Sequence, residues 1–413
     1  MKSSNPFTQH KAGRRTRLGS LILLLAVSQA APAEVSLADA VAAAYTRQQD
    51  GRVAQAQRDL GQALETRASQ LLSGDPSFNL KYQTDAVGAG NGYREWEGGV
   101  NLPLWWPGQR SAQRREAERV YGSADALARA RKLDVAGEVR ERLWGLALAR
   151  STQQEAQLAY DSAQQLERDI SRRVEAGELP RSDLLLAQKE TLFREDDLRQ
   201  AGNRAQQAER RFQSYTGLSE VPAAQTEALG EVQDLTAQHP MLALVTADAE
   251  RARARRDRVA SERRSGTSLW VGGKTVRDIS GADYNSAVGL EISVPFGSRS
   301  HAAPALADAE AALTEAAVNQ QRTRLELEGA LVAAKLERER AETALQRASA
   351  RKSLADESLK LSRRAFELGE TDLVRLLQAR RDALGAHSEY EMRRLQLGQA
   401  IARLNQISGV IPQ

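Results

Sequence analysis

The sequence predicts an α+β membrane protein that combines long coiled-coil helical hairpins with four amphipathic β-strands and uses one structural unit twice. Three observations predict this fold class. Helical periodicity runs through very long stretches, four short segments alternate apolar and polar residues, and a pattern recurs after 192 residues.

The first 33 residues are typical of a secretory signal peptide. Basic residues such as Lys11 and Arg14 precede an apolar run at 18–27 and a small-residue ending at 31–33. We therefore expect cleavage after Ala33. The alternatives are a membrane anchor, for which the apolar run is shorter than the roughly 20 residues required, and a twin-arginine signal, although paired arginines are common in any signal peptide.

Removal of this segment changes the net charge of the protein. Residues 1–33 hold five of the 58 basic residues and no acidic ones, which leaves 53 basic and 54 acidic residues and a net charge of −1 instead of +4. Nucleic-acid binding, which depends on excess positive charge, loses its support. The arginines at 251–258 alternate with Ala and Asp on a predicted helix and indicate a solvated helix face. The chain contains no cysteine, so no disulfide is expected.

A single shift of 192 residues aligns three separate parts of the chain without gaps. The aligned pairs are 100–104 with 292–296, 177–178 with 369–370, and Gly217 with Gly409. One register over more than a hundred residues indicates an internal duplication. We expect a signal peptide at 1–33, a first repeat at 34–225 and a second repeat at 226–413.

Each repeat is predicted to contain a helix, a strand pair and a helical hairpin. In the first repeat, helical periodicity runs from about 37 to 72 and again from 111 to 175, and the hairpin is expected to cover 111–215. In the second repeat the hairpin is expected at 303–408, with a first helix that ends near Leu368. At 1.5 Å per residue the long helices would span roughly 100 Å. Their Ala-rich faces favour close, coiled-coil-like packing.

The strand pairs are predicted at 77–104 and 268–296, where residues alternate with a period of two. Phe78, Leu80 and Tyr82, for example, alternate with polar residues, as in a membrane barrel strand that faces lipid. Aromatic residues at the strand ends predict interfacial girdles: Tyr82, Tyr93, Trp96, Trp105, Trp106, Trp270, Tyr284 and Phe296. A hairpin that caps a helical bundle is the alternative. Because closed membrane barrels need about eight strands or more, the four strands predict an oligomer.

Taken together, these features resemble the TolC-like outer-membrane efflux proteins (outer membrane factors). The resemblance covers residues 35–410 and is carried by the duplication, by Pro-Leu-Trp-Trp-Pro-Gly-Gln-Arg at 103–110 and by the hairpin-end motifs at 172–178 and 364–370. It implies a TolC-like channel-tunnel: a homotrimer with a 12-stranded barrel in the outer membrane of a Gram-negative bacterium and a large periplasmic helical portion.

The resemblance also implies a function and partners. It implies a passive duct of a tripartite efflux or type I secretion system, coupled to a periplasmic adaptor (membrane fusion protein) and an inner-membrane pump. A periplasmic helical adaptor and a coiled-coil scaffold are the other classes considered. An adaptor is expected to carry a lipoyl-like or compact β-rich domain and not to duplicate a strand pair.

Function is placed at the hairpin ends by the same resemblance. The residues expected to bind the adaptor are Arg172, Gly177, Glu178, Leu179, Arg364, Gly369, Glu370 and Thr371. The alternative for Gly177 and Gly369 is that they only end their helices and bind no partner, because a helix reversal commonly needs a left-handed residue. Asp183 and Asp372 follow the reversals. They are expected to be N-terminal caps or, in a trimer, carboxylate rings of a periplasmic gate.

No catalytic, cofactor or metal site is predicted. His239, His301 and His387 are expected in a turn, at a strand–helix junction and in a helix, and none is paired with a nucleophile. No Gly-rich phosphate loop and no glutamate–histidine metal motif occurs, and Met241 and Met392 are too sparse for a soft-metal relay. The sequence predicts a passive conduit and does not indicate its cargo.

Overall fold

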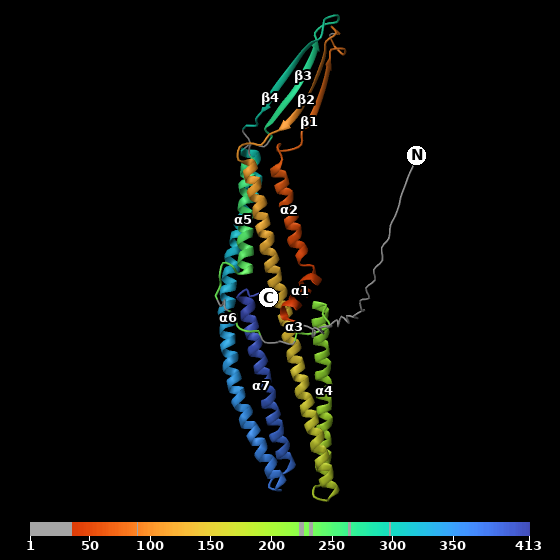
Figure 1. Cartoon of the computed structure of the whole chain (residues 1–413), viewed down its shortest axis with the longest axis vertical. Helices are drawn as coiled ribbons and strands as arrows, with labels where there is room; N and C mark the ends of the chain where they lie inside the picture. The colour runs from red at the N-terminus through yellow and green to blue at the C-terminus, as the bar shows by residue number, and fades with distance from the viewer. Residues whose placement is uncertain (1–34, 89, 223–226, 231–233, 263–265, 297–298) are drawn as a thin grey trace, which may run out of the picture. The chain divides into compact units, whose positions relative to one another are not determined.

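The computed structural model describes residues 35–413 except 89, 223–226, 231–233, 263–265 and 297–298. The predicted signal peptide lies outside the described residues. The helices and strands, in chain order, are α1 (Leu37–Gln48), α2 (Gly51–Ser69), β1 (Ser77–Thr84), β2 (Arg94–Pro103), α3 (Gln109–Glu175), α4 (Arg181–Thr216), α5 (Pro240–Ser261), β3 (Ser268–Arg277), β4 (Asn285–Ser293), α6 (Arg299–Glu367) and α7 (Leu373–Ile407) (Figure 1).

The strands form one antiparallel sheet in the order β1-β2-β3-β4, so the two strand pairs meet through β2 and β3. Strand alternation gives the sheet two different faces. Across one level of the first face the aligned residues are Phe78, Val100, Val271 and Leu290. All four are more than a third exposed to solvent in the single chain. The opposite face carries polar side chains such as Lys81 and Glu97. The predicted amphipathic strands are therefore confirmed.

Trp270 does not lie where the sequence pattern placed it. Its neighbours in β3, Leu269 and Val271, are aligned with residues of the apolar face, and alternation puts Trp270 on the polar face. There it is aligned with Asn101 on one side and Glu291 on the other. The prediction that Trp270 belongs to an interfacial girdle on the apolar side is wrong, because three consecutive apolar residues obscure which of them point to the same face.

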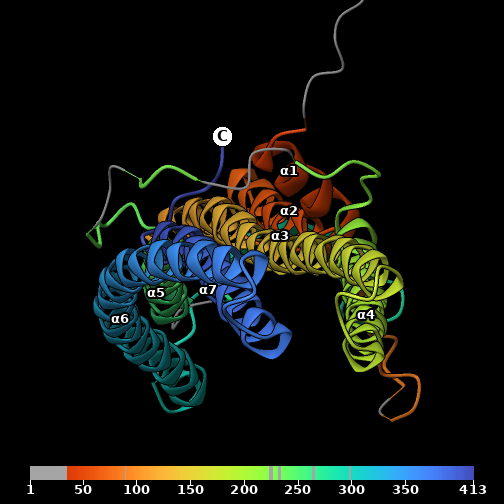
Figure 2. The ribbon, with the colours of Figure 1, turned by 90° about the horizontal axis from the view of Figure 1, so that it is seen from below.

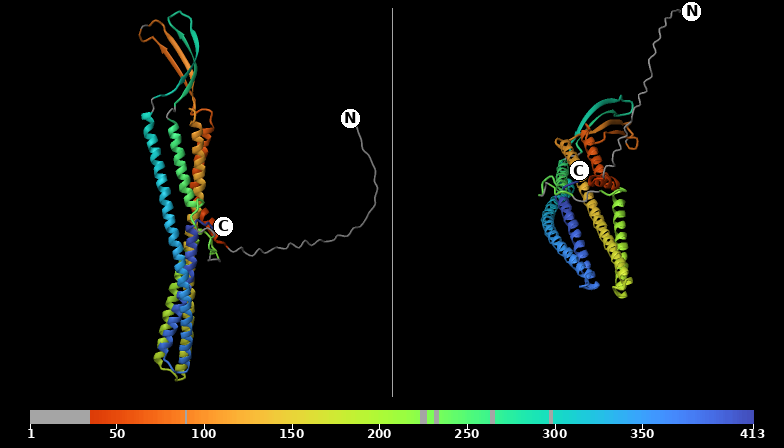
Figure 3. Two further views of the ribbon diagram at one scale, coloured as in Figure 1. Left: turned by 90° about the vertical axis from the view of Figure 1, so that its left-hand side faces the viewer. Right: turned by 60° about the horizontal axis from the view of Figure 1, so that its bottom comes forward.

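Two long helical hairpins, α3–α4 and α6–α7, extend away from the sheet (Figures 1 and 3). Helix α3 also packs against α1, α2, α5 and α7, and α5 packs against α6 (Figure 2). The main apolar cluster joins α1, α3 and α4 and includes Val41, Val139, Leu143 and Phe212. Many other buried positions of α3 are alanines, as expected for closely packed helices. None of the described helices has the length and apolar composition needed to span a membrane.

The continuous helix predicted at 37–72 is in fact two helices. Helix α1 ends before Gln49, whose φ of 59° is left-handed, and α2 begins at Gly51. Residues 46–50 are all polar and Gly51 has no side chain, so no apolar stripe holds one straight helix across the break. Arg47, in the last turn of α1, instead donates a hydrogen bond to the carbonyl of Ser214 at 3.1 Å. The break thereby lets α1 pack against α4 as well as α3.

The 192-residue shift also relates elements of the structure. It carries the end of α3 at 175 onto the end of α6 at 367 and the start of α4 at 181 onto the start of α7 at 373. Gly217 and Gly409, related by the same shift, have φ values of 79° and 82°. These equivalences support the duplication. The exact division of the chain into repeats at 225 remains a prediction.

Candidate functional site: the hairpin ends and the central joint

The first hairpin turns in a glycine-terminated reversal. Gly177 has a φ of 78°, and its N–H donates to the carbonyl of Val174 at 3.0 Å, while Glu178 N–H donates to the carbonyl of Arg173 at 2.8 Å. This pair of bonds is the Schellman arrangement, which satisfies helix carbonyls that would otherwise lack donors. No atom lies within 4 Å of the place where a Cβ would be at Gly177. The position therefore requires glycine for its backbone angle and not for space.

The second hairpin repeats this geometry. Gly369 has a φ of 73°, and its N–H donates to the carbonyl of Phe366 at 3.1 Å. Glu370 N–H donates to the carbonyl of Ala365 at 2.9 Å. A Cβ at Gly369 would again meet no atom within 4 Å. The two predicted tip glycines thus occupy the same backbone conformation in the two hairpins.

An apolar cluster holds the two hairpin ends together. We call it the tip cluster; its buried members are Leu166 and Ile170 of α3, Ala187 of α4, Phe366 of α6 and Leu373, Leu376 and Leu377 of α7. Leu179 packs against this cluster and is half-buried, so its side chain supports the tip and is also partly exposed. The guanidinium of Arg173 lies 5.0 Å from the centre of the Phe366 ring, which adds a cation–π contact between the hairpins. The tip residues of both repeats therefore form one surface.

The charged tip residues are largely exposed. The side chain of Arg172 is 75% exposed and pairs with Asp169, and that of Arg364 is 72% exposed and lies 3.8 Å from Glu367. Glu178 pairs with Arg173 at 3.1 Å. Glu370 is exposed and Thr371 is half-buried. Since exposed ion pairs contribute little to stability, these arginines are available for other anionic partners.

The two predicted gate residues have different structural roles. Asp372 is the N-cap of α7, where its Oδ1 accepts a hydrogen bond from the N–H of Arg375 at 2.9 Å. Asp183 lies inside the first turn of α4 and makes no such cap; the N-cap there is Pro180. The 192-residue shift carries Pro180 onto Asp372, so the two aspartates are not equivalent. The capping alternative therefore describes Asp372 and is wrong for Asp183.

Sequence reasoning missed a polar contact between the hairpins above the tip cluster. The carboxylate of Glu190 in α4 accepts hydrogen bonds from Arg194 of the same helix and from Arg381 of α7 at 2.8 Å. Burial opposes ionisation of this carboxyl, but the bonds from Arg381 and the charge of Arg194 outweigh it and lower the pKa of Glu190. The spacing of Glu190 and Arg194 signals a helix pair, but nothing in the local sequence points to Arg381.

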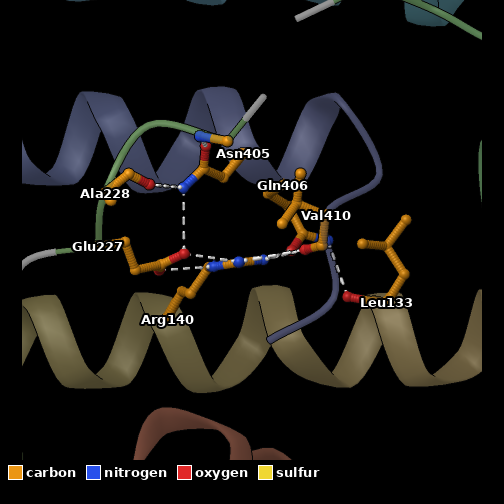
Figure 4. Close-up of polar contacts among 8 residues, drawn as sticks. Leu133, Arg140, Glu227, Ala228, Asn405, Gln406 and Val410 are labelled. Carbon is orange, nitrogen blue, oxygen red and sulfur yellow. Dashed lines mark hydrogen bonds and ion pairs between the residues drawn. The ribbon is translucent and has the colours of Figure 1, made fainter. Parts of the chain in front are cut away.

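A second network was also missed and lies at the middle of α3 (Figure 4). We call it the central joint. Arg140, whose side chain is only 4% exposed, donates to both carboxylate oxygens of Glu227 at 2.8 and 2.7 Å and to the carbonyl of Val410 at 3.2 Å. Asn405 donates to the carbonyl of Ala228 at 2.9 Å. The joint thus ties the segment between the two halves and the end of the chain to α3.

Residues 226–410 match the family model of the outer membrane efflux protein. This matched part of the chain, its second half, is an outer membrane efflux protein domain. No curated protein sequence matches the chain significantly.

Solved channels share the fold over nearly the whole chain. The outer membrane protein VceC of Vibrio cholerae is 13% identical with a TM-score of 0.71, covering 90% of this chain and 96% of its own. The CmeC outer membrane channel of Campylobacter jejuni is 15% identical with a TM-score of 0.66, covering 91% and 86%. The MtrE outer membrane channel of Neisseria gonorrhoeae is 15% identical with a TM-score of 0.66, covering 91% and 89%.

The matched domain and the shared channel fold together support the general function. This efflux protein is the outer-membrane channel component of a tripartite system in a Gram-negative bacterium and has a large periplasmic tunnel. Proteins of the family are trimers and passive ducts, so the chain is not an enzyme. The predicted channel-tunnel fold is confirmed, and the alternatives of a periplasmic adaptor and a coiled-coil scaffold are not supported.

Proposed function

We propose that the hairpin ends of this efflux protein dock onto a periplasmic adaptor, which connects the duct to an inner-membrane pump. The observation that carries the proposal is the pair of matching reversals on one tip cluster. Because α3 runs from the sheet to Glu175, its reversal lies at the end of the hairpin farthest along the helix from the sheet. That end is the part of a periplasmic tunnel that a partner from the inner membrane reaches first.

The charges around the reversals give this surface its chemistry. Arg172 and Arg364 present guanidinium groups that are suited to carboxylates of a partner, and Glu178 and Glu370 present acceptors for basic groups. Their present ion pairs are exposed and can be exchanged at little cost. The glycine reversals add a bare backbone surface between these charges.

We place a periplasmic gate on the two aspartates just after the reversals. In a trimer, three copies of Asp183 and three of Asp372 would bring like charges toward one axis, an arrangement that favours bound cations or nearby arginines. Arg375 and Arg181, both exposed, are the nearest candidates along the chain. Asp372 already stabilises the start of α7, so it would serve as both cap and gate.

Photo-crosslinking in cells tests the docking proposal. A photoreactive amino acid at position 364 is expected to capture a periplasmic adaptor, which mass spectrometry of the product would identify. Gly369→Val is expected to reduce this cross-link strongly while the trimer remains in the outer membrane, because a β-branched residue resists a φ of 73°.

The matched control is Gly329→Val, at an exposed position of α6 where a Cβ meets no atom within 4 Å and φ is not positive. It is expected to leave the cross-link unchanged. Cross-links only to further copies of this chain, or equal loss in both variants, would contradict docking at the tip.

A further inference from the structure

The indole of Trp270 lies against a row of glycines on the polar face of the sheet. Gly99, Gly272 and Gly289 are aligned across β2, β3 and β4. A Cβ added at Gly99 would lie 2.5 Å from Trp270 Cε2, one at Gly272 would lie 2.3 Å from Cζ2, and one at Gly289 would lie 3.1 Å from Cζ3. Because ring atoms of Trp270 lie this near the Cβ positions of glycines on three adjacent strands, the indole lies flat against the backbone of the sheet. We call these glycines the cradle.

The next row of the same face supplies a negative charge beside the indole. Trp270 is aligned there with Asn101 and Glu291, and the row continues to Ser77. Glu291 is exposed and makes no ion pair with any residue in the described part of the chain. Neither this row nor the cradle row contains a basic residue. The surroundings of the indole therefore favour a positively charged ligand.

The lysines of this face lie one row beyond the cradle and have acidic neighbours. Lys81 Nζ is 3.6 Å from Glu95 and 3.8 Å from Glu97. Lys274 is aligned with Glu97 across β2 and β3. The charges of the two lysines are thus balanced by Glu95 and Glu97, whereas the carboxylate of Glu291 beside Trp270 has no such partner among the described residues.

We infer that Trp270 and Glu291 form a contact site in the channel wall for flat organic cations. The inference rests on the role of the protein as a duct, in which the apolar face of the sheet meets lipid and the polar face lines the lumen. An aromatic face attracts cations and stacks on flat rings, and the carboxylate adds charge attraction. In a trimer three such sites face one lumen. The cradle keeps each ring against the wall, so the site contacts passing solutes without closing the channel.

Current block in planar bilayers tests the site. The purified trimer is measured with ethidium, a flat aromatic cation, and with fluorescein, a flat aromatic anion. Ethidium is expected to reduce the single-channel current at lower concentration than fluorescein. Trp270→Ala is expected to weaken the ethidium block about tenfold, and Trp270→Phe less, since a smaller ring retains part of the attraction. Glu291→Gln is expected to weaken the ethidium block and not the fluorescein block, because the carboxylate attracts the cation and repels the anion.

Trp96→Ala is the matched control, because Trp96 lies on the opposite face of the sheet. It is expected to leave the ethidium block unchanged. Equal block in Trp270→Ala and the unmodified trimer, or equal weakening in Trp96→Ala, would overturn the site. If Glu291→Gln changes nothing, the carboxylate is paired across a subunit boundary and the proposed pair is wrong. Absence of any channel current from the unmodified trimer would instead contradict the duct itself.

Substitutions of two adjacent glycines, Gly99 and Gly98, test whether the cradle holds the indole. Gly99→Ala is expected to push the indole into the lumen and lower the conductance without any probe. Gly98→Ala is the control, since its Cβ would point to the other face and lie 3.4 Å from Leu80 Cδ1. Gly99→Ala combined with Trp270→Ala is expected to restore the conductance. A conductance that Gly99→Ala leaves unchanged would show that the ring is not held by the cradle.

Discussion

Replacing Arg140 with alanine is expected to loosen the end of the chain from α3. The guanidinium is the centre of the central joint, and its removal leaves the carboxylate of Glu227 without its cation. The carbonyl of Val410 loses its donors at the same time. The protein is therefore expected to fold but to release the segments near 227–230 and 405–410 more easily.

The structure gives the size of this effect. Breaking a buried ion pair by removing one partner costs about 3–5 kcal/mol. Glu227 is 18% exposed and keeps a hydrogen bond from Asn405 at 3.3 Å, which reduces the penalty. We expect a loss of about 2–4 kcal/mol per chain in the free energy that holds the joint closed.

Hydrogen exchange of the detergent-solubilised trimer measures the effect where it occurs. Amides at 405–410 are expected to exchange at least tenfold faster in Arg140→Ala, while amides of the tip cluster are unchanged. The control is Arg131→Ala on the same helix, whose pair with Asp134 is 3.8 Å long and about half exposed, so little change is expected. The reasoning is refuted if both variants exchange alike. Adding Glu227→Ala to Arg140→Ala is expected to recover part of the loss, because no carboxylate then remains unpaired.

Two further predictions concern protons and ions. His239 caps α5 by accepting a hydrogen bond from Met241 N–H, and burial lowers the pKa of its imidazole. As the pH falls, the unfolded chain therefore binds the proton before the folded protein does. The free energy of unfolding is expected to be constant above about pH 6.5 and to fall below it. Thermal unfolding at pH 5 and 7.5 should show a smaller difference in His239→Asn, which keeps a capping side chain. Asp372→Ala, and more so the double change with Asp183→Ala, is expected to alter conductance and cation preference in bilayers without affecting trimer assembly; unchanged selectivity would place the gate elsewhere.

Features that depend on local periodicity were predictable from the sequence. The strands, the long helices and the glycine reversals each follow from residues close together in the chain, such as the Gly-Glu pairs at 177–178 and 369–370. The face occupied by Trp270 was not predictable, because the cradle is assembled from three strands of both halves. The central joint was missed for the same reason, since Arg140 and Val410 are 270 residues apart.

The duplication preserved backbone geometry more strictly than side-chain chemistry. Gly177 and Gly369 keep one conformation because any other residue would strain the reversal. The position after each reversal was free to change, and a proline stands in the first repeat where Asp372 caps the second. A trimer therefore presents six similarly shaped hairpin ends of two chemical kinds. An adaptor that contacts all six must tolerate both kinds, whereas one that contacts three can select between them by charge alone.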